Sequence, residues 1–312
     1  NSDLKPDWLW IKQRSSTENH MLVDSTRGVT KYLSTDSTGA EATVTSRVAS
    51  LDTDGFTLNG ASNPVNASGA TYVGWQWKAN GGTTASNTEG NVTNTLQVNQ
   101  DAGFSISKFT SASSGNTTIG HGLGVAPACF ITKIASGTSG WWVNHKGLTN
   151  QSDKYLGLNV TQAEGTVSWG AAPTSTLITM APAFIGNGTT TVMCYAFAEK
   201  QGYSKFGKYV GNGNADGTFV YTGFKPAFVM FKRTNATRSW VIIDNKRDTS
   251  NVASTRLFPD LANADSTLAD LVDFLSNGFK LRNTNVITNG SGSDYIYMAF
   301  AENPFVTSTG IP

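Results

Sequence analysis

The sequence predicts an all-β protein made of three tandem antiparallel β-sandwich domains of the jelly-roll or lectin-like kind. A phrase of one proline, an apolar run and a lysine occurs three times, at Pro6–Lys12, Pro127–Lys133 and Pro226–Lys232. Roughly 70 residues after its proline, each copy closes on an aromatic-rich run, at Tyr72–Trp77, Val192–Phe197 and Tyr295–Phe300. Landmarks that match at matching offsets identify a tandem repeat.

The repeat period indicates domains rather than a stacked solenoid. Consecutive copies of the phrase start about 100 to 120 residues apart, against roughly 20–50 residues in solenoid repeats. A unit of this length can bury a core of its own. We therefore expect a Gly/Thr-rich linker at residues 81–103 and three domains, at residues 1–80, 104–201 and 202–312.

Composition agrees with the all-β class. Charged residues make up only 14% of the chain, aromatic residues reach 11%, and glycine is abundant at 32 residues. β-Branched and aromatic residues favour strands, whereas glycine and asparagine favour the turns between them. With 38% apolar residues the chain has enough material for packed cores, which argues against intrinsic disorder.

Charge and hydropathy narrow the possible partners. The formal net charge of +1 gives no basic footprint, so we expect no nucleic-acid partner. No apolar run approaches the roughly 20 residues that span a bilayer, so we expect no membrane insertion. The chain opens without a signal peptide and has no methionine before Met21, which we interpret as a piece of a longer chain.

The first unit shows how the repeated phrase forms a strand. Trp8, Trp10 and Lys12 alternate with Leu9 and Ile11, so the two sets lie on opposite faces of one strand. Further strands are expected at residues 20–23, 44–49 and 72–77, with polar turns between them.

Units two and three carry one strand more than unit one. The added front strand is predicted at residues 104–109 and 203–208, and we expect unit one to take its counterpart from sequence upstream of this chain. Residues 266–275 have leucines at helical spacing. They align with the alternating residues 44–51 of unit one, so we predict a strand there as well.

These motifs resemble a known kind of β-sandwich repeat. The features that carry the likeness are the proline–apolar–lysine phrase, a turn followed by Gly-Phe-x-Leu, and an Ala-Phe-Ala-Glu close at Ala196–Glu199 and Ala299–Glu302. Together they are similar to virion-surface and tail-fibre-like structural proteins of marine and cyanobacterial phages. Unit one departs from the pattern at its close, which reads Gly74-Trp-Gln-Trp-Lys78.

The resemblance implies a non-enzymatic protein of the virion surface, and so an extracellular one, that acts in a tail fibre or appendage and contacts host-cell glycans. Its partners would be copies of itself in a homotrimer, other virion proteins and a host surface glycan. Two alternatives stay open: a capsid-decorating or spacer protein with no ligand, and a glycan depolymerase. No cofactor is expected, and a fold alone does not supply a function.

The residues carry no catalytic motif that the sequence reveals, so we predict that the protein is not an enzyme. The histidines have no metal-ligand spacing, at His20, His121 and His145. Acids recur at one position of every copy, at Glu41, Glu164 and Asp265. An acid that recurs in each copy serves the fold of the copy more readily than a single active site.

Two weak candidate sites remain in the sequence. Asn212, Asn214 and Asp216 resemble the first half of a calcium loop, but the glutamate that would complete it is Gly223, so a plain turn is the simpler interpretation. Trp169 has no matching aromatic in the other copies and stands beside Gly170. Carbohydrate sites use exposed aromatic side chains beside polar ones, so Trp169 is the candidate ligand-binding residue.

Two residue pairs have structural interpretations. Cys129 and Cys194 occupy positions that hold mostly aromatic residues in the sister copies, which favours packing, although a disulfide within unit two is conceivable. Asp24 and Arg27 stand three residues apart in unit one, and Asp244 and Arg247 stand at the same spacing in unit three. We interpret each Asp–Arg pair as a local ion pair of little net value that stabilises a turn.

Overall fold

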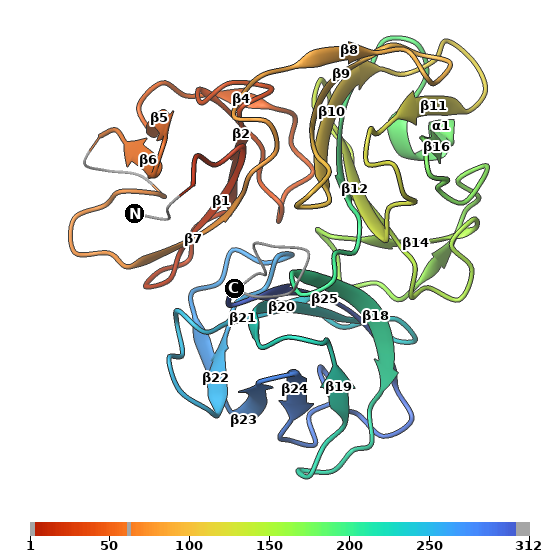
Figure 1. Cartoon of the computed structure of the whole chain (residues 1–312). Helices are drawn as coiled ribbons and strands as arrows, with labels where there is room; N and C mark the ends of the chain where they lie inside the picture. Colours follow the sequence, from red (N-terminus) through yellow and green to blue (C-terminus); the bar gives the residue numbers. More distant parts are fainter. Residues whose placement is uncertain (1–3, 61–63, 304–312) are drawn as a thin grey trace.

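The computed structural model describes residues 4–60 and 64–303, and it consists almost entirely of β-strands. Figure 1 shows three groups of strands around a common centre, one for each copy of the repeated phrase. We call them repeat 1 (β1–β7), repeat 2 (β8–β17) and repeat 3 (β18–β25). The all-β prediction is confirmed, and the described residues contain no helix long and apolar enough to cross a membrane.

Repeat 1 is the smallest of the three. Its main sheet has the order β2-β1-β7, and the short pairs β3-β4 and β5-β6 accompany it. The strands are β1 Trp8–Gln13, β2 Met21–Asp24, β3 Lys31–Tyr32, β4 Ala42–Thr43, β5 Val48–Asp52, β6 Gly55–Leu58 and β7 Tyr72–Trp77.

Repeat 2 contains an eight-stranded sheet in the order β15-β14-β13-β12-β17-β10-β9-β8, and a separate pair β11-β16. Its elements are β8 Ala85–Asn87, β9 Asn94–Asn99, β10 Phe104–Thr110, β11 Thr117–Gly120, β12 Cys129–Ile134, β13 Trp141–His145, β14 Lys154–Gly157, β15 Gly165–Thr166, β16 Leu177–Met180, α1 Pro182–Ile185 and β17 Thr191–Phe197.

Residues 81–103 therefore hold two paired strands, β8 and β9, where the sequence predicted a linker. These strands were not predicted because several of their buried side chains are polar, so the segment lacks the apolar pattern of a strand. Asn94 and Gln97 of β9 are buried, and Asn94 donates to the Ser107 hydroxyl at 3.0 Å while Gln97 donates to the Ser25 hydroxyl at 2.9 Å. Buried amides that donate in this way hold a strand in place without an apolar pattern.

Repeat 3 has two four-stranded sheets, in the orders β18-β25-β20-β21 and β19-β24-β23-β22. The strands are β18 Ser204–Val210, β19 Phe219–Tyr221, β20 Pro226–Arg233, β21 Val241–Asp244, β22 Ala253–Arg256, β23 Ser266–Leu275, β24 Gly278–Leu281 and β25 Asp294–Ala301. The predicted strand at residues 266–275 is confirmed as β23, which pairs with both β22 and β24.

All three repeats follow one plan. The strand of the repeated phrase lies between the following strand and the closing strand of its repeat, in the orders β2-β1-β7, β13-β12-β17 and β21-β20-β25. Each phrase begins at a buried proline, at Pro6, Pro127 and Pro226. The predicted front strands are β10 beside β17 and β18 beside β25. In the described part of repeat 1, β7 pairs with β1 alone, and the upstream strand stays a prediction.

These central strands are buried on both faces because each face meets a different core. In β1, Trp8 and Trp10 join a cluster that draws residues from all three repeats, whereas Leu9 and Ile11 join a cluster confined to repeat 1. We call the first cluster the shared core and the other three the outer cores. A common core packs the repeats into one body, whereas the sequence predicted separate domains; the exact domain boundaries stay a prediction.

The last aromatic side chains of the three closing strands meet in the shared core. The ring centroids of Trp77, Phe197 and Phe300 lie between 5.3 and 6.3 Å from one another, in edge-to-face arrangements. Aromatic pairs at this separation and angle attract one another beyond their burial. The repeated close of the sequence is therefore the centre of the molecule.

Backbone hydrogen bonds close the three repeats into a ring. At each junction, which we call a seam, an N–H group of one repeat donates to a carbonyl of another. These bonds are Glu18 to Ala262 (3.0 Å), Ser139 to Thr38 (2.9 Å) and Arg238 to Thr161 (2.8 Å). The first of them joins repeat 1 to repeat 3, so the ring closes between the two ends of the described chain.

Two of the lysines that end the phrase donate across a seam, whereas Lys12 donates to the Gln13 and Ser16 carbonyls of its own repeat. Lys12, Lys133 and Lys232 are fully buried. The Lys133 ammonium donates to the Thr38 carbonyl of repeat 1 at 3.3 Å, and the Lys232 ammonium to the Thr161 carbonyl of repeat 2 at 3.1 Å. Burial lowers the pKa of Lys133 and of Lys232 to about 8, because it removes water from the charged form.

The two aspartate–arginine pairs that the sequence predicted are present as local ion pairs and are buried, and their net contribution to stability stays a prediction. The side chains of Arg27 and Arg247 are 1% exposed, and their Nε atoms lie 2.5 and 2.7 Å from the carboxylates of Asp24 and Asp244. Asp24 also accepts a hydrogen bond from the Tyr195 hydroxyl of repeat 2 at 2.8 Å. A buried charge is costly to leave without its partner, so these pairs matter to the fold.

The two cysteines are free and buried, and they belong to different cores. Cys129 lies in the shared core, whereas Cys194 lies in the outer core of repeat 2. Their strands are neighbours, but the side chains point to opposite faces of the sheet, which a disulfide cannot bridge. The packing interpretation is confirmed, and burial raises the pKa of both thiols.

Candidate functional site

Trp169 is buried, so the prediction that it is a surface aromatic is wrong. Its ring stacks on Phe184 of α1 with centroids 3.8 Å apart, and its Nε1–H donates to the Lys154 carbonyl at 2.8 Å. The indole belongs to the outer core of repeat 2. The burial of Trp169 could not be predicted from the repeat, because Phe184 lies in a short helix that has no counterpart in the described parts of repeats 1 and 3.

The Asn212–Asp216 loop is a turn held by its own side chains. The Asn212 and Asn214 side-chain oxygens accept the N–H groups of residues two positions later, both at 3.0 Å. The Asp216 carboxylate pairs with the Lys280 ammonium at 2.5 Å. The oxygens of the candidate calcium ligands are thus engaged, and the part of the chain that the structure describes has no metal-binding group of three or more His, Cys, Asp or Glu.

The histidines serve the fold. His20 occupies the position that holds Trp141 and Trp240 in the other repeats, accepts a hydrogen bond from Trp10 Nε1 at 2.9 Å and donates to the Phe258 carbonyl at 3.0 Å. His145 lies within 3.1 Å of the Tyr297 carbonyl across another seam. Burial lowers the pKa of His20 to about 3 and that of His145 to about 4, so both rings are neutral at physiological pH.

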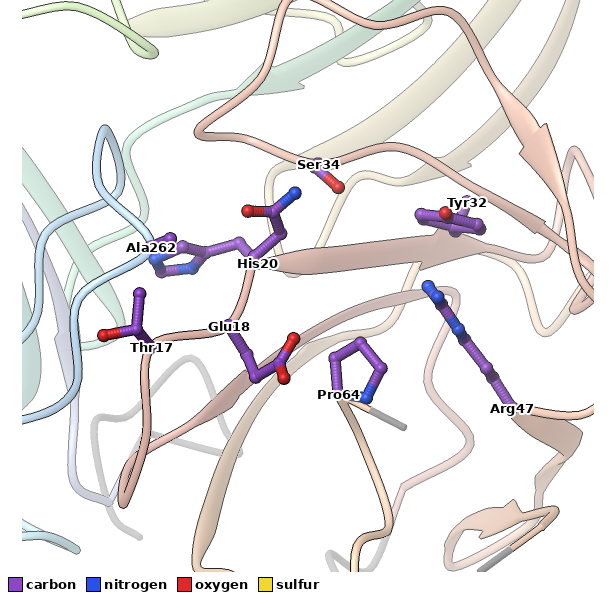
Figure 2. Close-up of a pocket in the computed structure, with 9 residues that line it drawn as sticks. Thr17, Glu18, His20, Tyr32, Ser34, Arg47, Pro64 and Ala262 are labelled. Carbon is purple, nitrogen blue, oxygen red and sulfur yellow. The ribbon is translucent and has the colours of Figure 1, made fainter. Parts of the chain in front are cut away.

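A polar hollow lies at the seam between repeats 1 and 3, and we call it the seam pocket. Its volume is about 270 Å³, and Figure 2 shows the side chains around it. The residues that could meet a ligand are Glu18, Asn19, Tyr32, Ser34 and Arg47. They come from the loop before β2, from β3 and the residue after Leu33, and from the start of β5, all in repeat 1.

A rigid frame holds the seam pocket. The Glu18 N–H is tied to the Ala262 carbonyl of repeat 3, and His20 is fixed at both ring nitrogens. Asp36 accepts the His20 N–H at 3.1 Å, and burial raises the pKa of this carboxyl to about 6. The pocket wall is therefore anchored to backbone on both sides of the seam, which preorganises the side chains that it carries.

Arg47 and Tyr32 form one wall. The guanidinium carbon of Arg47 lies 4.4 Å from the centroid of the Tyr32 ring, a cation–π arrangement that Figure 2 shows to the side of Pro64. In repeat 2 the equivalent tyrosine is Tyr155, whose ring packs between Trp142 and Phe184 in the outer core. The same position thus completes a core in repeat 2 and supports a surface charge in repeat 1.

The two charged side chains of the seam pocket form no ion pair in the described part of the chain. The Glu18 carboxylate and the Arg47 guanidinium take part in no ion pair within residues 4–60 and 64–303, and Figure 2 shows them on opposite sides of Pro64. Carboxylate and guanidinium groups in a hollow offer acceptors and donors to a hydroxyl-rich ligand. The arrangement suits binding by hydrogen bonds rather than covalent chemistry.

Sequence reasoning missed this pocket because its residues lie in separate segments of repeat 1, which only the folded chain brings together. One signal was available, namely the histidine where two sister copies have tryptophan. A departure from the repeat marks the seam at which the pocket lies.

The fold and the seams define an all-β protein of three structural repeats closed into a ring. The chain belongs to the DUF7483 family, described as a domain of unknown function, which matches residues 1–304. The match spans all three repeats. Comparison with curated proteins and with solved structures finds no match.

Proposed function

We propose that the chain is a non-enzymatic structural protein of a phage virion, a tail fibre or surface appendage built from three small sandwich repeats, that contacts host-cell glycans. The motifs at Pro6–Lys12 and its two copies support the class, through their resemblance to virion-surface repeats. The seam pocket carries the proposal of glycan contact. The proposed location is the virion surface, outside the cell.

The chemistry of the seam pocket supports a sugar as the ligand. A pocket of about 270 Å³ is at the small end of ligand sites, which span roughly 300–1,000 Å³, and this suits one sugar unit at the end of a chain. The Glu18 carboxylate can accept from two neighbouring hydroxyls, and the Arg47 guanidinium can donate to ring or hydroxyl oxygens. Asn19 and Ser34 add one amide and one hydroxyl at the rim.

The recurring acids support a structural role. Glu41 lies 3.4 Å from the Arg27 guanidinium, and Asp265 lies 2.6 Å from Arg14 and 3.1 Å from Arg247. Carboxylates that pair with arginines in this way serve the fold. A glycosidase instead needs two acids that face one groove, one of them kept protonated.

A glycan array tests the proposal on the purified chain. We expect binding to a subset of bacterial surface glycans, and the double variant Glu18→Gln/Arg47→Ala should lower that binding at least about tenfold, since two charged hydrogen-bonding groups are lost. The matched control is Arg233→Ala in repeat 3, whose guanidinium donates to Asn235 and lies outside the pocket. Equal binding by the double variant and the wild type would remove the seam pocket from the proposal.

Immunogold labelling of intact virions tests the location. Label on tails or appendages is expected, whereas label on virions combined with no glycan binding would favour the spacer or capsid-decorating alternative. No label on any virion would contradict the structural class.

Assembly is a separate proposal. We propose a homotrimer, because linked weak glycan sites gain about 10²–10⁴ in avidity without new contacts. The threefold arrangement inside one chain makes a threefold assembly of chains a natural extension. Light scattering coupled to size exclusion decides it, with a mass near three times 33.2 kDa expected and a monodisperse species of 33.2 kDa contradicting it.

A further inference from the structure

Two aromatic side chains stand exposed side by side on strand β19 of repeat 3. Phe219 is 44% exposed and Tyr221 is 64% exposed, and as residues i and i+2 they project from the same face. Val220 between them is buried in the outer core. Folded proteins seldom leave neighbouring aromatic rings in water without a ligand or partner for them.

Glycines brace both rings. A side chain added at Gly223 would lie within 3.5–3.8 Å of the Tyr221 ring and hydroxyl, and one added at Gly278 would lie 3.1 Å from the Phe219 ring. Each ring therefore lies beside a glycine, where a larger residue would crowd it. Gly223 has a φ of +85°, and its N–H and that of Thr222 donate to the Asn277 carbonyl, so the turn that carries Tyr221 is fixed to the next strand pair.

Tyr221 also lines a cleft of about 450 Å³ between β19 and the connection from repeat 2 to repeat 3. The opposite wall carries Gln201 and the ion pair of Lys205 with Glu199, whose Nζ and Oε1 atoms are 2.8 Å apart. The Gln201 amide makes no hydrogen bond in the described chain. The cleft thus combines an open aromatic face with an amide, a carboxylate and an ammonium.

We propose that this cleft, which we call the Tyr221 cleft, binds a pyranose unit of a saccharide, with the sugar ring lying flat on Tyr221. A pyranose has an apolar face of C–H groups that suits an aromatic ring, and hydroxyls around its edge. Gln201 offers both a donor and an acceptor to those hydroxyls, and Lys205 a donor. Glu199 pairs with two ammonium groups, those of Lys146 and Lys205, so its carboxylate is already neutralised and holds Lys205 in the wall of the cleft.

A protein partner fits the site less well. A specific protein interface covers about 800 Å² on each side, whereas the exposed aromatic surface here consists of two rings beside a polar cleft. The inference rests on the proposed function only for its ligand class. The site belongs to repeats 2 and 3 and shares no residue with the seam pocket.

Saturation-transfer NMR tests the proposal with the full chain and a panel of methyl glycosides of glucose, galactose, mannose and N-acetylglucosamine. We expect transfer to the ring protons of at least one glycoside. Tyr221→Ala should weaken binding at least about tenfold and Gln201→Ala about fivefold, whereas Tyr221→Phe should retain the stacking and most of the affinity. Both positions are at the surface, so folding is expected to survive, and a thermal melt checks it.

Phe219→Ala is the matched control, since Phe219 lies on the same strand but outside the lining of the cleft. Its affinity should stay within about twofold of the wild type. Transfer to none of the glycosides, or an equal loss in Phe219→Ala and Tyr221→Ala, would overturn the proposal. Arg47→Ala should leave this binding unchanged, so the Tyr221 cleft and the seam pocket can fail independently.

Discussion

Two of the seams have the same hydrogen bond but different side chains that make it. One seam joins repeat 1 to repeat 3, and the other joins repeat 2 to repeat 1. At the second seam the Trp141 indole donates to the Ser34 carbonyl at 2.9 Å, and at the first the His20 ring donates to the equivalent carbonyl of Phe258 at 3.0 Å. An imidazole is much smaller than an indole. The seam pocket lies beside the histidine.

Some contacts recur in every repeat and others change. The backbone hydrogen bonds between repeats and the buried lysine of each phrase recur, so we call them the frame of the ring. The side chain that crosses the seam can change, provided that it still reaches the carbonyl of the neighbouring repeat. A repeat protein can thus acquire a binding site at the copy that departs from the pattern, without altering the frame.

Removing the crossing side chain should give the largest effect and should differ between the seams. We expect Trp141→Ala to lower the free energy of unfolding by about 3–5 kcal/mol, because a fully buried indole leaves a large cavity. His20→Ala should cost about 1–2 kcal/mol, mainly through its two lost hydrogen bonds. Chemical denaturation followed by circular dichroism measures both, and equal costs would break the comparison.

The next largest effect concerns the buried charges that cross the seams. Asp24 accepts from Tyr195 of repeat 2, and Asp244 accepts from Trp75 of repeat 1 at 3.1 Å. In repeat 2 the strand register places His145, whose ring is neutral, at the position of the aspartate, and Leu148 at that of the arginine. The acid and the arginine are therefore kept or lost together from one repeat to the next.

We expect Asp24→Asn to cost about 2–3 kcal/mol, because it leaves the Arg27 guanidinium buried without a carboxylate. The double variant Asp24→Asn/Arg27→Leu removes both charges, as repeat 2 does at these two positions, and should recover most of that loss, since replacing both partners of a buried pair is often close to neutral. Denaturant unfolding of both variants measures the difference. A double variant less stable than the single one would show that repeat 1 requires the charge itself.

Much of the fold could be predicted because the signal is repeated. The alternation of Trp8 and Trp10 with Leu9 and Ile11 predicted the two-faced strand, and the aligned copies predicted that residues 266–275 form a strand against their helical spacing. The shared core could not be predicted, since alternation shows that both faces are apolar but not which repeat covers them. The ring results from contacts between residues far apart in sequence, such as Glu18 and Ala262.

The candidate sites were harder to predict for a related reason. Trp169 was predicted to be exposed because it lacks a matching aromatic in the other repeats, but Phe184 of α1 in repeat 2 packs on it. Tyr221 was not singled out, because nothing near it in the sequence shows that its ring stays exposed beside Gly223. Exposure depends on packing, and packing was the part of the structure that the repeat did not encode.

The smallest expected effect is a pH dependence that again distinguishes the seams. Burial lowers the pKa of Lys133 to about 8, with no acid to oppose it, whereas the burial that lowers the pKa of Lys12 is opposed by Asp36, Asp265 and Glu18. Between about pH 8 and the usual lysine value of 10.5, the unfolded chain binds a proton that the folded chain has released at Lys133. This difference raises the free energy of unfolding with pH at Lys133 and likewise at Lys232, whereas the thiols of Cys129 and Cys194, whose pKa burial raises, lower it above about pH 8.5, where unfolded thiols ionise. The contribution of Lys133 is therefore the difference in slope between the wild type and a variant at Lys133.

Denaturation at about pH 7.5, 8.5 and 9.5 measures this slope below the range in which the tyrosines titrate. Lys133→Met should make the slope less positive than in the wild type, because one of the two strongly shifted lysines is gone, and Lys12→Met should change it less, because the acids oppose the effect of burial on the pKa of Lys12. A slope that Lys133→Met leaves unchanged would mean that the seam carbonyls of Thr38 and Ile134 keep Lys133 charged, and that the ammonium is a required part of the frame.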